Sequence, residues 1–248
     1  MRAFLAGILS SEESNGGGGG TTFNVNSANL DPNQFFKTDE YINTGLIDDY
    51  SFVAWVNVDN ISNTDGTIIS YSNGNNRSVN IRYADGLGLS YIYSNPSFGG
   101  AYFNIILSSG WHLIQMSCSS SVVNLYVDGA FIGSVPKGSP PTDLAGFYLE
   151  IGAFRNGTTG RYKGLLYEPQ VYNRELTLSE HQTMYNSGVA KCFSSLPTSI
   201  TNDCVYAPRL GNYDNNIGQE LIDQSTSGIV TTNVNNTPFT GTGLQVEC

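Results

Sequence analysis

Short apolar runs separated by turn residues follow one another from residue 23 to about residue 188. In residues 79–83 apolar and polar side chains alternate, the period of two that is expected where one face of a sheet is buried. Residues 123–127 alternate in the same way and run into Asp128-Gly129, a dipeptide typical of a tight hairpin turn. This pattern predicts roughly eleven to thirteen strands of about five residues. No helix-length period precedes residue 175, so the pattern favours an antiparallel two-sheet sandwich without βαβ units.

One of these runs is apolar at nearly every position. Residues 51–58 read Ser-Phe-Val-Ala-Trp-Val-Asn-Val, so both faces of this strand offer apolar side chains. A strand of that kind needs packing partners on both sides. We therefore predict a central position for it in its sheet.

The stretch 162–181 closes the predicted sandwich. Its first part alternates as a strand through residues 165–171. Pro169 inside this strand predicts an edge position or a bulge, because proline has no N–H for the ladder. The period then changes at a corner, and a short helix near residues 178–186 is predicted to follow, with Ser179 as its cap.

Composition divides the chain into three segments. Residues 1–22 resemble a separate leader that ends in five glycines at 16–20, a run with no preferred conformation of its own. Residues 23–188 carry the sandwich. Residues 189–248 have too few apolar residues to form a core alone. We expect a mostly irregular C-terminal extension that wraps the sandwich or reaches a neighbour, with a strand around 228–234.

The leader leaves two alternatives open. Its first nine residues resemble the opening of a signal peptide, but the apolar part is short and two glutamates follow it. The segment is expected either to anchor the chain on a partner subunit or to cover the domain's own sheet.

Charge excludes some classes of partner. The chain has 11 Lys and Arg against 21 Asp and Glu, a formal net charge of −10. This balance repels phosphate backbones and anionic membranes, so no nucleic-acid binding is expected. No run approaches the roughly 18 to 20 apolar residues that a membrane-spanning helix needs.

The four cysteines fall into two groups. Cys118 lies on the less polar side of a strand pattern and is expected to be a buried free thiol. One disulfide is expected among Cys192, Cys204 and Cys248 if the protein lives outside a reducing compartment, and the sequence leaves its pairing open. No two cysteines have the short spacing typical of a zinc site.

Five motifs in order carry a resemblance to a known family. They are Phe-Val-Ala-Trp-Val at 52–56, Gly-Trp-His-Leu-Ile at 110–114, Leu-Tyr-Val-Asp-Gly at 125–129, Leu-Glu-Ile-Gly at 149–152 and the segment 164–180. The last contains Val-Tyr-Asn-Arg-x-Leu-Thr-x-x-Glu, the most specific of them. In order and spacing the chain is similar to the laminin-G-like (concanavalin A-like) jelly-roll family over about residues 23–188. Glu168-Pro169 departs from the family pattern, where another strand former follows the acidic residue.

The resemblance implies an all-β, antiparallel jelly roll of the concanavalin A-like type, in a family that includes lectins and glucanases. Glucanases of this fold need two carboxylates on one strand face. Here Glu150 and Glu168 stand isolated in their strands. His112 is expected to pack or hydrogen-bond beside Trp111, and His181 is expected to be solvated on the surface of the short helix. No enzymatic activity is predicted.

Binding is the better supported prediction. Lectins offer aromatic faces to sugar C–H groups and amides to sugar hydroxyls. The candidate ligand-binding residues are Tyr71, Tyr83, Tyr91, Tyr93, Tyr102 and Tyr162. The alternative for each tyrosine is that it simply covers the outside of a sheet.

Calcium binding is a further property that the resemblance implies, and no other cofactor is expected. Loop aspartates supply the oxygen ligands that Ca²⁺ prefers. The candidates are Asp48, Asp49, Asp65 and Asp143. Each is equally explained as a turn residue or a helix cap, and no contiguous calcium-binding loop is present.

These observations favour a non-enzymatic adhesion module that presents a lectin-like jelly roll for glycan or host-surface contact. A glycine tether and a low-charge surface rich in Asn, Thr and Gly fit a virion component, such as a phage decoration, spike or fibre protein. We expect a homo-oligomer that contacts other subunits through residues 1–22 and 189–248, at the virion surface or else extracellularly. The alternatives are a purely structural capsid or appendage subunit and a secreted glycan-binding or glycoside-hydrolase-like protein.

Overall fold

The computed structural model describes the chain from the first strand to the last, with gaps. The described residues are 22–30, 35–38, 49–58, 66–73, 77–84, 86–95, 97–141, 147–154, 160–208, 220–221, 223–225, 227, 229, 231–234 and 239–247. The leader up to residue 21 lies outside them. Within these ranges no helix is long and apolar enough to cross a bilayer.

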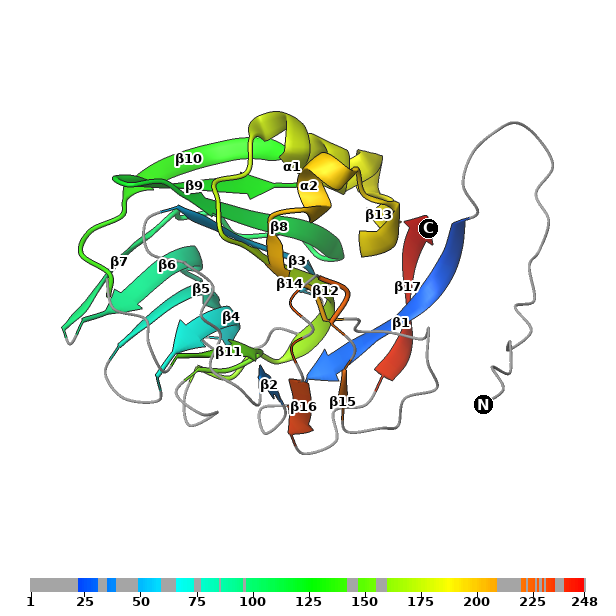
Figure 1. Ribbon diagram of the computed structural model, residues 1–248, viewed down its shortest axis with the longest axis horizontal. Coiled ribbons are helices and arrows are strands. Elements are labelled where there is room, and N and C mark those ends of the chain that lie inside the picture. The colour runs from blue at the N-terminus through cyan, green and yellow to red at the C-terminus, as the bar shows by residue number, and fades with distance from the viewer. Residues whose placement is uncertain are drawn as a thin grey trace.

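Two sheets form a sandwich, as predicted (Figure 1). The larger sheet has nine strands in the order β10 (Ala130–Pro136), β9 (Val122–Val127), β8 (Trp111–Cys118), β3 (Tyr50–Asn57), β12 (Gly164–Tyr172), β1 (Thr22–Leu30), β17 (Phe239–Glu247) and β13 (Ala190–Lys191), with β14 (Cys204–Tyr206) also paired to β12. All pairs are antiparallel except β13 with β17.

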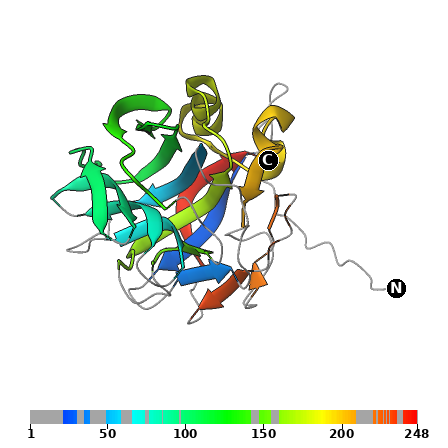
Figure 2. The same cartoon turned by 60° about the vertical axis from the view of Figure 1, so that its left-hand side comes forward.

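The second sheet has eight described strands. Their order is β15 (Glu220–Leu221), β16 (Thr231–Val234), β2 (Phe35–Thr38), β11 (Tyr148–Ile151), β4 (Gly66–Ser72), β5 (Ser78–Ala84), β6 (Gly88–Ser94) and β7 (Phe98–Tyr102). Figure 2 brings forward the end of the sandwich where the edge strands β7 and β10 lie, one in each layer.

Three local predictions are confirmed. The apolar run at 51–58 forms β3, which is buried along its whole length and lies between β8 and β12. The β9–β10 hairpin turns at Asp128 and Gly129, both with positive φ (53° and 71°), as this tight turn requires. At Pro169 the pairing of β12 with β3 shifts register between Tyr167 and Gln170, which is a β-bulge.

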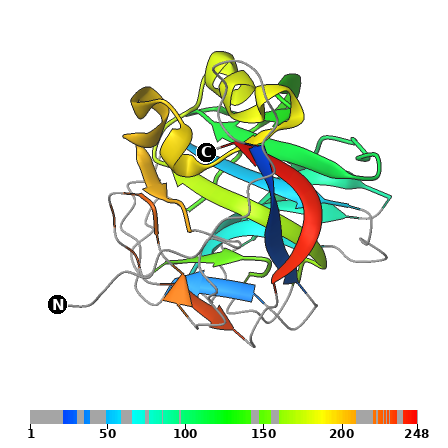
Figure 3. The ribbon, with the colours of Figure 1, turned by 90° about the vertical axis from the view of Figure 1, so that its right-hand side faces the viewer.

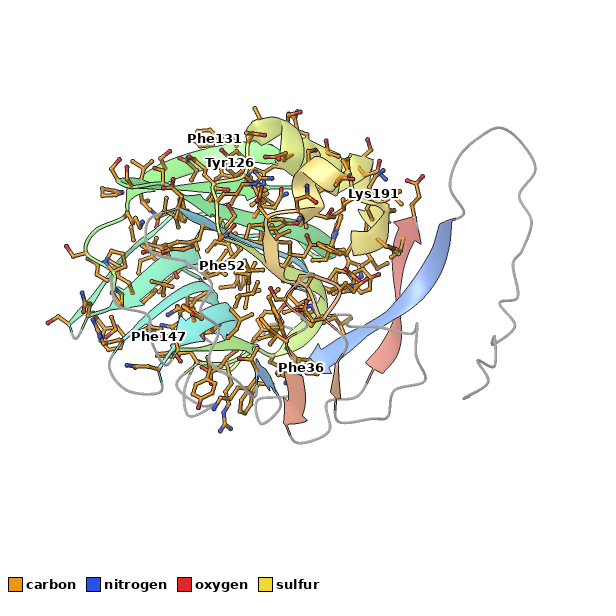
Figure 4. The ribbon with its side chains drawn as sticks, in the orientation of Figure 1. Phe36, Phe52, Tyr126, Phe131, Phe147 and Lys191 are labelled. Atoms are coloured by element: carbon orange, nitrogen blue, oxygen red, sulfur yellow. The ribbon has the colours of Figure 1, made fainter. Side chains whose placement is uncertain are left out.

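The main core lies between the sheets, because each strand turns its apolar alternate residues inward. Phe36 comes from the eight-stranded sheet and Phe52 from the nine-stranded sheet. Phe147 immediately precedes β11, and all three rings are buried between the layers (Figure 4). This arrangement leaves two outer faces, one on each sheet.

The outer face of the nine-stranded sheet is covered by a second apolar cluster. Val53, Trp55 and Leu113 on the sheet meet Met184 of α1 (Leu178–Tyr185) and Ile200 of α2 (Thr198–Thr201). The helices lie above this sheet, and β17 runs beside β1 (Figure 3). The cluster also includes Phe193 and Leu196, from the short 3-10 helix η2 (Phe193–Ser195) and the residue after it. Both outer-cluster helices and β13 follow the closing strand β12 in the chain.

The C-terminal segment therefore contains more regular structure than expected. Its strands β13, β14 and β17 join the nine-stranded sheet, and β15 and β16 join the eight-stranded sheet. The strand predicted around 228–234 is present as β16. The described strands of this segment extend both layers of the sandwich.

The predicted short helix is present, but its cap is one of the corner residues. Thr177, not Ser179, is the N-cap: its Oγ1 accepts the N–H of Glu180 at 3.3 Å, and the Glu180 carboxylate accepts the N–H of Thr177 at 2.8 Å. Because the helix begins at Leu178, Ser179 lies inside the first turn. The reciprocal pair is a capping box.

The cysteines differ in state. Cys118 is a free, buried thiol, as predicted, and Cys204 is free and buried as well. Cys192 is disulfide-bonded, and its partner lies outside the described residues, as does Cys248. Cys204 therefore takes no part in the disulfide that was expected among the three C-terminal cysteines.

Candidate functional site

Among the described residues, the outer face of the eight-stranded sheet is mostly polar. Its core-facing residues, such as Ile69, Val79 and Tyr91, alternate with residues that point away from the core. These outward residues are Phe35, Lys37, Thr67, Ser70, Ser72, Ser78, Asn80, Arg82, Ala84, Ser90, Ile92, Ser94, Phe98, Tyr102, Tyr148 and Glu150. Apart from Ala84, Ile92 and the aromatics, all of them are polar or charged.

Strand register aligns these residues in rows. One row runs Lys37, Glu150, Ser70, Asn80 and Ile92 across β2, β11, β4, β5 and β6. A neighbouring row runs Tyr148, Ser72, Ser78, Ser94 and Phe98. A third joins Arg82, Ser90 and Tyr102. Neighbouring strands lie about 4.8 Å apart, so each residue is adjacent to the next along its row.

The centre of this face forms what we call the polar band: Ser70, Ser72, Ser78, Asn80, Ser90, Ser94 and Glu150. Each of these side chains is at most 1% exposed. Ser72 donates to Glu150 Oε2 at 2.9 Å, and Ser70 lies 3.3 Å from the same oxygen and 3.1 Å from the carbonyl oxygen of Ala153. Ser78 Oγ and both polar atoms of the Asn80 amide have no hydrogen-bond partner.

An exposed aromatic platform borders the polar band at the sheet edge. Phe98 and Tyr102 on β7 are 62% and 43% exposed, and register places them beside Ser94 and Ser90. Gly100 between them can carry no side chain, since a Cβ there would lie 2.2 Å from the carbonyl oxygen of Tyr91. We call Phe98 and Tyr102 the β7 platform. At the opposite flank, Lys37 Nζ lies 3.7 Å from the centre of the Tyr148 ring, a cation–π contact.

The six candidate tyrosines separate by burial. Tyr102 is exposed on the β7 platform, and Tyr93 is half-buried against the core. The remaining four, Tyr71, Tyr83, Tyr91 and Tyr162, are buried in the core. Their rings face the interior because their positions have the inward parity of their strands, or, for Tyr162, because its hydroxyl donates to the carbonyl of Asn57 at 3.2 Å. They therefore have no ring face available to a sugar in solution.

Phe98 was not among the candidates. Its signal in the sequence is weak, because it lies between the loop after β6 and two glycines. Only the pairing of β7 with β6 shows that it shares a face with Tyr102.

The candidate calcium ligands do not form a described site. Asp49 is exposed. Asp48, Asp65 and Asp143 lie outside the described residues. Within the described ranges no three His, Cys, Asp or Glu side chains gather as a metal site.

The two candidate acids lie on different sheets. Glu150 belongs to β11 of the eight-stranded sheet, whereas Glu168 belongs to β12 of the nine-stranded sheet and lies 3.4 Å from the Gln224 amide. Both are buried. Hydrolysis of a glycosidic bond requires two carboxyl groups on either side of that bond. Glu150 and Glu168 do not form such a pair.

His112 makes the hydrogen bonds that were predicted for it. Its Nδ1 lies 2.8 Å from Asp128 Oδ2, and its Nε2 lies 3.1 Å from Ser108 Oγ and 3.0 Å from the Ser108 carbonyl oxygen. This resembles a Ser-His-Asp triad, in which Nε2 must accept the serine proton. The Asp128 carboxylate can only accept, which favours an N–H at Nδ1, and Nε2 contacts both the hydroxyl and the carbonyl of Ser108, so its role depends on the tautomer. Through these hydrogen bonds the His112 ring connects Ser108 to Asp128 in the β9–β10 turn.

The prediction for His181 is wrong: it is fully buried on the face of α1 that packs on the nine-stranded sheet, not solvated. Its ring lies 3.9 Å from that of Tyr126, and Nε2 lies 2.9 Å from Ser117 Oγ. Burial lowers the pKa of His181 to about 3. Position 181 faces inward because the helix starts at Leu178, which places His181 and Met184 on the face that packs on the sheet.

Comparison with known proteins agrees with this geometry. A family profile described as the concanavalin A-like lectin/glucanases superfamily matches residues 15–180. A putative carbohydrate binding protein from Bacteroides ovatus superposes with a TM-score of 0.62 at 17% identity, over 90% of this chain and 61% of that one. This chain thus spans less than two thirds of that protein.

A smaller module is similar as well. The CBM40 of the IT-sialidase from Ruminococcus gnavus superposes with a TM-score of 0.52 at 13% identity, over 68% of this chain and 100% of the module. The same module bound to α2,3-sialyllactose superposes with a TM-score of 0.52 at 14% identity, with the same coverage. No curated protein matches the chain in sequence.

Proposed function

Because the chain belongs to the concanavalin A-like lectin/glucanases superfamily, we propose that it is a non-catalytic glycan-binding module whose contact surface is the β7 platform beside the polar band. One observation carries this proposal. The outer face of the eight-stranded sheet is polar across its centre, and its edge strand exposes Phe98 and Tyr102.

The chemistry of this face suits a sugar. A pyranose ring has faces rich in C–H groups and a rim of hydroxyls, and aromatic rings pack on the former while amides and hydroxyls bond the latter. The β7 platform provides exposed rings, and the exposed Tyr102 also carries a hydroxyl that can donate to and accept from a sugar hydroxyl. The putative carbohydrate binding protein and the CBM40 share this fold, which supports the proposal.

The non-catalytic part of the proposal rests on the separation of Glu150 and Glu168. The two acids lie on different sheets. We therefore expect no release of reducing ends from β-glucans. An increase in reducing ends that Glu150→Gln abolishes would contradict this.

We propose that the module is displayed on a virion surface, as a decoration, spike or fibre protein in a homo-oligomer, with an extracellular protein as the alternative. The glycine run at 16–20 suits a flexible tether to a particle. The net charge of −10 disfavours contact with nucleic acid. Mass spectrometry of the particles or supernatant from which the protein is purified tests it. Recovery of the protein free of other virion components would contradict it.

Replacing the platform rings tests the binding function. We expect Tyr102→Ala and Phe98→Ala each to weaken binding to the best ligand on a glycan array by about tenfold, because each removes one ring face. Phe131→Ala is the matched control. Phe131 is 53% exposed on β10 of the other sheet, so its loss should leave glycan affinity unchanged. Isothermal titration calorimetry measures all three.

Two results would contradict the proposal. One is the absence of any glycan ligand for the folded wild-type protein. The other is equal loss of affinity in Phe131→Ala and in the platform variants, which would place the contact elsewhere.

A further inference from the structure

The β7 platform belongs to a longer row of exposed residues at the edge of the eight-stranded sheet (Figure 1). Every second residue from 98 to 106 is exposed, and these residues are Phe98, Gly100, Tyr102, Asn104 and Ile106. We call them the edge row. The N–H of Phe103 donates to the Leu89 carbonyl at 2.9 Å, and the N–H of Leu89 donates to the Ile105 carbonyl at 3.3 Å. The chain therefore stays beside β6 past the end of β7.

The spacing of the two platform rings sets the length of a ligand that contacts both. Phe98 and Tyr102 lie four residues apart on one face of β7, which pairs with β6 without a register shift. At about 3.3 Å per residue their Cα atoms are about 13 Å apart. A pyranose is a six-membered ring, like the aromatic ring on which it stacks, so one sugar covers one platform ring only. An extended chain of about three to four sugars covers both, given this strand rise.

The surface between and beside the rings leaves room for such a chain. A Cβ at Gly100 would collide with the carbonyl oxygen of Tyr91, so no side chain fills the space between Phe98 and Tyr102. The backbone there is open to close approach by the middle of a ligand. Beyond Tyr102, the exposed amide of Asn104 can both donate to and accept from a sugar hydroxyl.

The turn that leads into β7 is anchored. The side-chain amide of Asn95 lies 3.4 Å from the carbonyl oxygen of Ser139 and 3.3 Å from that of Pro140, and it donates to both. These contacts tie the β6–β7 turn to the segment that follows β10. The platform is therefore held in place before a ligand arrives, which reduces the entropy that binding costs.

The edge row does not suit a protein strand as its partner. A peptide or a second copy of the chain adds to a sheet edge through a continuous ladder of backbone hydrogen bonds. Gly100 and Asn104 have φ values of 143° and 53°, whereas regular strands have φ near −120° to −140°. The backbone thus leaves strand geometry at two positions of the row and interrupts the ladder. The exposed rings remain as the contact surface, and aromatic rings suit the C–H faces of sugars.

We infer that the edge row binds the interior of a linear oligosaccharide that lies along β7. One sugar stacks on Phe98, another stacks on Tyr102, and the sugars between them lie over Gly100. This inference rests on the glycan-binding function proposed above. It adds the form of the ligand, which is an extended chain and not a single terminal sugar.

Chain length is the variable that tests the inference. The probes are β-1,4-linked homo-oligosaccharides of glucose, xylose, mannose and N-acetylglucosamine, each from one to six units, because such chains are as straight as a strand. Isothermal titration calorimetry measures their binding. For the series that binds, we expect affinity to rise about tenfold from the disaccharide to the tetrasaccharide and little beyond it, since only the longer chain reaches both rings.

The platform variants should lose this dependence on length. In Phe98→Ala and in Tyr102→Ala the tetrasaccharide should bind no more tightly than the disaccharide binds the wild type, because one ring remains. Phe131→Ala on β10 is the matched control and should keep the whole rise. All three side chains are exposed, so each variant should unfold at the wild-type temperature.

Four results would overturn the inference. Equal affinity for the disaccharide and the tetrasaccharide would do so, as would binding of a branched or terminal glycan on an array with no binding of any linear series. In both cases glycan binding itself would stand. An undiminished rise in both platform variants would place the chain elsewhere. A wild-type oligomer in sedimentation velocity that Tyr102→Ala dissociates would show that the row holds a second copy. If the wild type binds no glycan at all, the proposed function fails together with the inference.

Discussion

At the scale of single residues, burial decides what each ionisable or polar group can do. His181 and His112 are the chain's only histidines. His112 is half-buried and hydrogen-bonded through both ring nitrogens. The His181 ring is buried between α1 and the sheet, and its Nδ1 has no hydrogen-bond partner. The charged groups near His181 are Glu180 on its own helix and Arg174 at the corner, and they have opposite effects on its pKa. Desolvation is the larger cause, so the folded protein holds this ring neutral.

His181 makes the fold sensitive to mild acid. Its pKa is about 3 when folded and about 6.5 when unfolded, so the unfolded chain binds a proton that the folded chain does not. The stability that depends on the neutral ring is complete above pH 6.5 and is lost as pH falls toward 3, by about 1.4 kcal/mol per pH unit. Urea unfolding at pH 7.0 and 5.0 should show this loss in the wild type and in His112→Gln, but much less of it in His181→Gln. Equal stability of the wild type at both pH values would show that the ring is not sealed.

At the scale of elements, the corner between β12 and α1 depends on a compact polar network. Arg174 donates to both oxygens of Glu180, at 2.9 and 2.7 Å, and to Asp203 at 2.9 Å. Arg174 and Thr177 together lower the pKa of Glu180 to about 2. The stabilisation from this carboxylate is therefore present above about pH 4.5 and is lost as pH falls toward 2. A helix of eight residues is marginal alone, so the network and the packing of Met184 hold it.

The cap can be tested on its own. Thr177→Ala removes the hydroxyl that accepts the Glu180 N–H, and it should lower the free energy of unfolding by about 1 kcal/mol. Thr183→Ala on the same helix is the control, because the Thr183 hydroxyl only donates back to the Ser179 carbonyl. Chemical denaturation of both variants at pH 7 measures the difference. Equal losses in the two variants would mean that Thr177 acts as an ordinary helix threonine.

At the scale of the whole molecule, the first and last described strands, β1 and β17, pair in the same sheet. β17 lies between β1 and β13, and the N–H of Cys192, just after β13, donates to the carbonyl of Glu247 at 3.0 Å. Leu244 and Val246 of β17 belong to the outer apolar cluster. The last strand is therefore part of the domain and not an appendage. The disulfide at Cys192 restrains the chain directly after β13, the strand that pairs with β17.

Loss of that disulfide should destabilise the whole domain. Cys192→Ser should lower the free energy of unfolding by about 2 to 4 kcal/mol, because the unfolded chain loses a cross-link. A reducing agent should lower the unfolding midpoint of the wild type and leave that of Cys192→Ser unchanged. Cys118 and Cys204 are buried, and burial raises the pKa of each thiol to about 12, so neither should react with a thiol reagent before unfolding. A thiol that is titrated in the native protein would contradict this assignment.

Local predictions succeeded where a residue type has one dominant backbone consequence. Pro169 has no N–H and produced a bulge, and Asp128-Gly129 tolerates positive φ and produced a hairpin turn. Predictions failed where the outcome depends on a neighbour far away in sequence. The tyrosines at 71, 83, 91 and 162 could form a sugar-binding surface by residue type, yet strand parity turns the first three into the core and a hydrogen bond to the Asn57 carbonyl holds Tyr162 there. The cap was missed because Thr177 and Ser179 are both good cap residues, and only the packing of α1 selects between them.

The sequence by itself determined the sandwich, its central strand, the closing corner with its short helix and the likeness to concanavalin A-like proteins. Alternation and turn chemistry are local properties, so they can be read along the chain. Tertiary structure alone decided which sheet face is covered by α1 and α2 and which is left polar. It also decided that Phe98 joins Tyr102 and that Asn80 is buried without a partner. These features arise from pairing between strands and from packing between layers, which bring together residues that the sequence holds far apart.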